Sequence, residues 1–137
     1  MTFTRLLTSA LAATLFCLTA FSPAQASDLK ITEMAVTTKI VKGNPIDSVW
    51  RISSSSVKAL YCFTRISAPK GSDTTIKHVW YLDGKVVHED EMPVKGSHWR
   101  TYSRKAVEKG MSGEWRCEAQ DEDGNVLKSV SFKMNGK

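Results

Sequence analysis

Glycine and proline are scarce in this sequence, which has 8 glycines and 4 prolines among 137 residues. Collagen-like and low-complexity chains contain far more of both, so these classes are excluded. With 42% hydrophobic and 24% charged residues, the composition is typical of one ordinary globular domain and not of a coiled coil. The chain is also too short for most multi-domain enzymes.

Charge is absent from residues 6–27, a mostly apolar stretch that follows a lone Arg5. A basic start, an apolar run and a final small-x-small pattern predict a signal peptide over residues 1–26. A retained membrane anchor is the alternative, although the apolar run is at the short end of the length that spans a bilayer. Lipoprotein processing at Cys17 is a second alternative, which the bulky Phe16 before it disfavours. We expect a periplasmic or secreted protein without stable membrane insertion after cleavage.

Cysteine is also rare, with three in the whole chain. Cys17 would leave with the signal peptide, so the mature chain would keep Cys62 and Cys117. An even cysteine count in an exported protein favours a disulfide over a metal pair or a reactive thiol. In the chain-entropy model such a crosslink contributes on the order of 4 kcal/mol. We therefore expect a disulfide between Cys62 and Cys117.

Apolar and polar residues alternate through most of the mature chain. This period of two predicts strands, and turn residues separate them. The strongest local signal is a hairpin at Asp83 and Gly84, a residue pair typical of a type I′ turn. The expected strands cover residues 34–41, 57–66, 75–82, 85–88, 97–103, 114–120 and 126–132, with one helical turn at 104–109.

These strands in a single domain of residues 27–137 predict an all-β fold, an immunoglobulin-like antiparallel β-sandwich of about seven strands. Cys62, Trp80 and Cys117 occur in the order of such sandwiches, where a tryptophan packs against the disulfide. Trp115 departs from the pattern, because it occupies the place of the usual tyrosine corner.

Several short motifs occur over about residues 60–132, and these are Leu60–Thr64, His78–Lys85, Trp99–Lys105, Gly113–Trp115 and Asp123–Gly124. Together they resemble the bacterial family called domain of unknown function 2914. The resemblance implies a small, mostly β module of bacterial envelope proteins and supplies no activity.

Catalytic patterns are missing, so we expect no enzyme, no catalytic residue and no cofactor. Ser112 lacks the strand-to-helix context of a nucleophile elbow. A two-residue turn at the predicted hairpin would pair Trp80 with Val87 and His78 with Glu89, and would place His88 on the opposite face. The histidines would then not converge as zinc ligands must, and we expect no metal site.

Basic and aromatic residues cluster around residues 99–105. Alternation places Arg100, Tyr102 and Arg104 on one face, and we include Lys105 and His78 as further candidate binding residues. The alternative is that the arginine stems only cover core tryptophans. As a site, the cluster would bind a sugar, an anionic glycan or a protein carboxylate.

The function predicted from the sequence is therefore an exported, non-catalytic binding module of the bacterial envelope that recognises a cell-wall glycan or an envelope protein. The alternative is a small periplasmic hydrolase or metal-dependent enzyme. Nucleic acid is not an expected partner, because the chain is exported and its formal net charge of +5 falls to only +4 when Arg5 leaves with the signal peptide.

Overall fold

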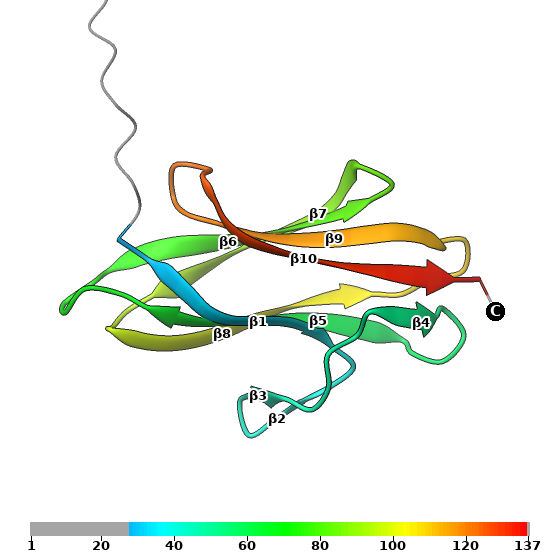
Figure 1. Ribbon diagram of the computed structural model, residues 1–137, viewed down its shortest axis with the longest axis horizontal. Helices are drawn as coiled ribbons and strands as arrows, with labels where there is room; N and C mark the ends of the chain where they lie inside the picture. The colour runs from blue at the N-terminus through cyan, green and yellow to red at the C-terminus, as the bar shows by residue number, and fades with distance from the viewer. Residues whose placement is uncertain (1–27, 137) are drawn as a thin grey trace, which may run out of the picture.

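The computed structural model describes residues 28–136, which form two β-sheets packed face to face (Figure 1). This confirms the predicted all-β, immunoglobulin-like class. The predicted signal peptide lies outside the described residues. Across residues 28–136 no helix is long and apolar enough to cross a membrane.

The first sheet has the strand order β1-β5-β8, and the second has the order β4-β10-β9-β6-β7. A small hairpin, β2–β3, lies on the outer side of the first sheet (Figure 1). All strand pairs are antiparallel except β4 with β10, which is parallel. The strands are β1 Lys30–Thr37, β2 Ile40–Val41, β3 Asn44–Pro45, β4 Arg51–Ser53, β5 Ala59–Ser67, β6 Thr74–Leu82, β7 Lys85–Val94, β8 His98–Ala106, β9 Gly113–Gln120 and β10 Val126–Asn135.

The expected helical turn at 104–109 is wrong. Arg104, Lys105 and Ala106 continue β8, because each pairs with a residue of β5 as far as Ala59. Cross-strand hydrogen bonding therefore overrides the local helical preference of this segment. As a result β8 spans nine residues and carries its side-chain alternation as far as Ala106.

The hairpin of β6 and β7 contains a β-bulge that the sequence pattern does not predict. Leu82 pairs with Lys85 and Tyr81 with Val86, but the register then shifts, and Trp80 lies opposite His88. A bulge inserts one extra residue on one strand, which moves all later residues to the other face. The predicted pairing of His78 with Glu89 is therefore wrong.

In the observed register His78 lies opposite Asp90. His88 shares the inward side of β7 with Asp90, and the two side chains form an ion-pair contact of 2.9 Å. The placement of His88 on the face opposite Trp80 is wrong for the same reason.

Aromatic rings fill the space between the sheets. Trp115 and Phe132 stack with their centroids 5.7 Å apart, and Trp80 meets both rings edge-on. Trp80 is fully buried and lies directly opposite Cys117 on the neighbouring strand. The expected position of Trp80 beside the cysteines is therefore confirmed.

Candidate functional site: an exposed arginine–tyrosine face

The outer face of the first sheet carries a group of cationic and aromatic side chains. Alternation along β5 and β8 directs them away from the core, and the register pairs Arg65 with Arg100 and Tyr61 with Arg104. We call this surface the arginine–tyrosine face. Its members are Tyr61, Arg65, Arg100, Tyr102 and Arg104.

Arg65 and Arg100 are directly opposite each other, an arrangement of like charges that destabilises a sheet unless other groups compensate. Asn44 supplies one compensation, since its Oδ1 accepts from Arg65 Nη2 at 3.2 Å and from Arg100 Nη1 at 3.0 Å. Glu33 supplies the other, through a 3.0 Å ion pair with Arg65 Nε. Asn44 therefore fixes the two guanidinium groups beside the β2–β3 hairpin.

Tyr102 is 49% exposed and stands between Arg100 and Arg104 along the strand. Its ring meets that of Tyr61 edge-on, with the centroids 6.1 Å apart. Within the described residues neither Arg100 nor Arg104 has a carboxylate partner within ion-pair distance. The face thus presents an exposed aromatic ring between two cations that have no carboxylate partner among the described residues.

Arg116 on the other sheet, in contrast, has both an aromatic ring and a carboxylate beside its guanidinium. The guanidinium of Arg116 lies 4.2 Å from the ring centroid of Tyr81, and its Nε is 3.4 Å from a carboxylate oxygen of Glu118. Arg116 is already stacked and paired, so it has less capacity for a ligand than Arg100 or Arg104.

Two predicted binding residues lie elsewhere. Lys105 is half-buried, pairs with the core residue Leu60, and donates its ammonium to the Ala106 carbonyl at 2.8 Å. His78 is fully buried, so it cannot contact a ligand at the surface. The inclusion of His78 in the predicted site is therefore wrong, because its strand position directs the side chain into the core. The role of Lys105 stays a prediction.

The sequence pattern missed Asn44, Arg65 and Tyr61. The pairing of β5 with β8 brings Arg65 and Tyr61 to the site across a long separation in the chain. Asn44 reaches it because the β2–β3 hairpin lies on this face (Figure 1). Only the turn signal around Asn44 is visible in the sequence, and that signal does not say which surface the turn contacts.

His78 belongs to a second cluster, which lies in the core. Ser103 Oγ is 2.8 Å from His78 Nδ1 and accepts from Trp80 Nε1 at 3.1 Å, while Thr64 Oγ1 is 3.1 Å from His78 Nε2. Both imidazole nitrogens therefore have hydroxyl partners. A catalytic histidine oriented by a carboxylate would need a different arrangement.

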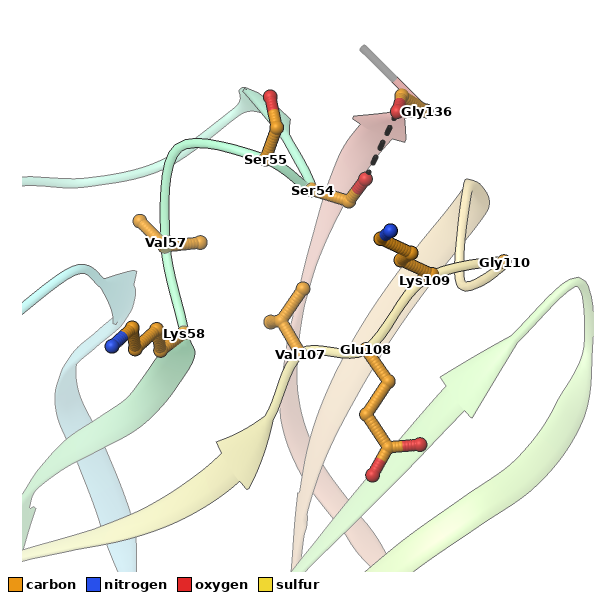
Figure 2. Close-up of a pocket in the computed structure, with 9 residues that line it drawn as sticks. All are labelled: Ser54, Ser55, Val57, Lys58, Val107, Glu108, Lys109, Gly110 and Gly136. Carbon is orange, nitrogen blue, oxygen red and sulfur yellow. Dashed lines mark hydrogen bonds between the residues drawn. The ribbon is translucent and has the colours of Figure 1, made fainter.

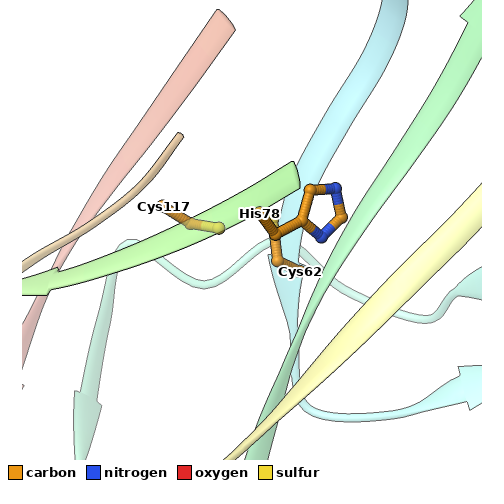
Figure 3. Close-up of side chains that lie close together, drawn as sticks. All are labelled: Cys62, His78 and Cys117. Atoms are coloured by element: carbon orange, nitrogen blue, oxygen red, sulfur yellow. The ribbon is translucent and has the colours of Figure 1, made fainter. Parts of the chain in front are cut away.

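Cys62 and Cys117 lie beside this imidazole (Figure 3). Their sulfur atoms and a nitrogen of His78 are all within 4.8 Å of one another. Both cysteines are buried thiols in this structure, and their disulfide stays a prediction. Burial raises the pKa of Cys62, but hydrogen bonding from Cys117 and the charge of His78 outweigh it and lower that pKa to about 6. Burial and the neighbouring Cys62 raise the pKa of Cys117.

Two thiols and an imidazole are also a ligand set suited to a thiophilic metal ion. A metal ion at this position would have to displace Thr64 or Ser103 from His78, because both ring nitrogens are already hydrogen-bonded. A disulfide between Cys62 and Cys117 would leave both hydrogen bonds of His78 in place. The contacts of His78 therefore favour a disulfide over a metal centre.

A pocket of about 610 Å³ opens at one end of the sandwich. Figure 2 shows that the loop before β5, the loop after β8 and the C-terminal end of β10 line it, and Ser54 donates to the Gly136 carbonyl there at 3.3 Å. Lys58 and Glu108 point away from each other in this view, so they form no acid–base pair. The lining residues are Ser54, Ser55, Val57, Lys58, Val107, Glu108, Lys109, Gly110 and Gly136.

Comparison with solved structures supports the class that the geometry defines, an immunoglobulin-like sandwich. An immunoglobulin-like protein from Pseudomonas aeruginosa matches 82% of this chain and 100% of its own, with 16% identity and a TM-score of 0.50. The alkylpurine DNA glycosylase AlkC of Pseudomonas fluorescens, bound to DNA containing an abasic site analog, matches 81% of this chain with 12% identity and a TM-score of 0.53. That match covers only 31% of the glycosylase chain, and at these identities both similarities show the fold alone.

The sequence is also similar to a known family. Residues 73–134 match the family described as "Protein of unknown function (DUF2914)". The expected resemblance is confirmed. No curated protein matches the chain.

Proposed function

We propose that this chain is an exported, non-catalytic binding module of the bacterial envelope, and that the arginine–tyrosine face recognises a partner bearing carboxylates, either an acidic glycan or an envelope protein. One observation carries the proposal. Arg100 and Arg104 flank the exposed ring of Tyr102 without carboxylate partners among the described residues.

The chemistry of these side chains supports a carboxylate ligand. A guanidinium presents a planar set of donors that matches a carboxylate with two parallel hydrogen bonds. An exposed tyrosine adds a flat ring on which a sugar or a side chain can stack, with its hydroxyl free to bond. Asn44 already orients Arg100, which lowers the entropy lost when a ligand binds.

Binding of the mature chain to a soluble polyuronate and to polyglutamate, with neutral dextran as the uncharged control, tests this proposal. We expect binding to at least one carboxylate polymer and weakening by added salt. Arg100→Ala and Arg104→Ala should each weaken that binding by at least about tenfold, since a hydrogen bond to a charged group contributes roughly 1.5–3 kcal/mol. Tyr102→Ala should also weaken it, because this substitution removes the ring on which the ligand stacks.

Arg51→Ala is the matched control, because Arg51 is an exposed arginine on β4 of the other sheet. It should bind like the parent, and all four variants should keep the parent's melting temperature. Absence of binding to both carboxylate polymers would refute the proposal, as would equal binding by the three site variants and the parent.

A further inference from the structure

The strand that carries the arginine–tyrosine face is also an open edge. In the described part of the chain β8 pairs only with β5, so its other side has no strand partner. Edge strands present a row of unpaired N–H and C=O groups to which another extended chain can add. β8 presents this row over nine residues, beside Arg100 and Arg104, which have no carboxylate partner among the described residues.

The side-chain spacing on β8 matches an extended peptide. Arg100 and Arg104 are four residues apart, which is about 13 Å along a strand at roughly 3.3 Å per residue. An added strand in register places every second side chain on the same face, beside Arg100, Tyr102 and Arg104 in turn. Carboxylates four residues apart in the peptide, with a stacking residue midway, would meet these three positions.

The positive charge of the arginines on β8 determines which kind of strand can add to this edge. A second copy of β8 would bring arginine beside arginine, which disfavours pairing of two identical edges. Arg65 opposite Arg100 already places two cations together, and Glu33 is the carboxylate paired with Arg65. The edge is therefore suited to an acidic strand.

We propose that the occupant of the arginine–tyrosine face is an extended acidic peptide segment of an envelope protein, which adds as a strand to the free edge of β8. This inference rests on the proposed function and selects the peptide over the glycan. Main-chain hydrogen bonds would supply affinity, while the arginines and Tyr102 would select the sequence.

The test uses a capped nine-residue synthetic peptide with glutamate at its third and seventh positions, tyrosine at the fifth and threonine elsewhere. Two further peptides carry N-methyl groups on alternate residues, one on the odd and one on the even positions. In strand addition only one alternating set of peptide N–H groups faces β8. We expect one methylated peptide to lose at least about tenfold in affinity and the other to bind like the parent peptide.

A double-mutant cycle fixes the register. Replacing each glutamate of the peptide by glutamine should weaken binding to the parent chain, and the loss should disappear in either Arg100→Ala or Arg104→Ala according to which arginine that glutamate meets. Arg51→Ala should leave both losses in place. If each glutamine substitution in the peptide weakened binding equally in the parent chain and in all arginine variants, no glutamate would meet a particular arginine, and the proposed strand register would be overturned.

Failure of this inference is distinguishable from failure of the proposed function. Equal binding of both methylated peptides would overturn strand addition while leaving carboxylate recognition intact. Binding of polyuronate without binding of any peptide would overturn the peptide and leave the proposed function. A dimer that forms through β8 and excludes the peptide would identify a second copy as occupant and overturn the inference.

Discussion

Ser103 lies at the centre of the polar contacts in the core. Its hydroxyl accepts from the Trp80 indole and lies within hydrogen-bond distance of His78, and all three residues are buried. Burying polar atoms is costly unless each finds a partner. His78, Trp80 and Ser103 belong to the motifs that carry the family resemblance, so part of these motifs builds the core.

The substitution Ser103→Ala should lower the free energy of unfolding by roughly 2–4 kcal/mol, because it leaves two buried polar groups without that partner. Urea unfolding measured against the parent checks this. Ser131→Ala, an exposed serine on β10, is the control and should change little. An equally small effect of both substitutions would show that Ser103 is not needed for the core network.

Asp47, which follows β3, is hydrogen-bonded to the end of β1 and to the next residue, Thr38. Its carboxylate accepts from Thr37 Oγ1 at 2.6 Å and from the Thr38 N–H at 2.8 Å. Burial raises the pKa of Asp47, but the hydrogen bonds from Thr37 and Thr38 outweigh this and lower it below the ordinary value of 3.8.

A lowered pKa in the folded state makes stability depend on pH. The contribution of Asp47 is complete above the unfolded-state value and is lost as pH falls through the folded-state value. We therefore expect the stability of the parent to fall more steeply below about pH 4 than that of Asp47→Asn. Urea titrations between about pH 2 and 6 measure both slopes, and parallel slopes would contradict this role of Asp47.

At the scale of elements, the sequence predicts the long strands well because they alternate between core and solvent. The turn at Asp83 and Gly84, the strand around Cys62 and the final hairpin are confirmed. The β-bulge is not predictable, since nothing in the local pattern shows which residue leaves the ladder. That single shift changes the partner of His78 and the face of His88.

The same limit applies to the site. Alternation alone predicts Arg100, Tyr102 and Arg104 on one face, and the register confirms it. The partnership of Asn44 with two arginines depends on where a short hairpin lies in three dimensions, which local patterns do not encode. The two-residue strands β2 and β3 are too short for a period to be read.

Gly113, the first residue of β9, packs closely against the turn of the β6–β7 hairpin. A Cβ at this position would meet Asp83 Oδ2 at 2.7 Å and Leu82 Cδ1 at 2.9 Å, and its φ of +146° disfavours other residues. Asp83 also accepts the Glu114 N–H at 3.0 Å. The hairpin turn therefore fits closely against the first residues of β9.

We expect Gly113→Ala to destabilise the fold by about 2–3 kcal/mol, since both backbone strain and a displaced Asp83 contribute. Gly71→Ala is the matched control, because its φ is +79° but nothing lies within 4 Å of the added Cβ. It should cost about 1 kcal/mol from conformation alone. Equal losses measured by urea unfolding would show that contact with the hairpin contributes nothing.

At the scale of the whole molecule, the two cysteines connect the two sheets. Cys62 is on β5 of the first sheet and Cys117 on β9 of the second. A crosslink between them would hold the layers of a small core together, with a typical contribution of about 2–4 kcal/mol. Both cysteines are fully buried in the folded chain, so an oxidant must reach them before the core closes around them.

Export and oxidation are therefore tested together. In an oxidising compartment a Cys62 thiolate that is still exposed during folding would attack the disulfide of the oxidant, which forms a mixed disulfide and releases one thiolate of the oxidant. Cys117, after losing its proton, would then attack the Cys62 sulfur, which forms the Cys62–Cys117 bond and releases the oxidant in its reduced form. Mass spectrometry of chain recovered from the periplasm should show a first residue Ser27 and a mass lower by two hydrogens than the dithiol. Chemical reduction should lower the melting temperature of this protein and leave the Cys62→Ser, Cys117→Ser double variant unchanged. An intact Met1 would contradict cleavage, and two free thiols in the recovered chain would contradict the disulfide and return the Cys62–His78–Cys117 cluster to consideration as a metal site.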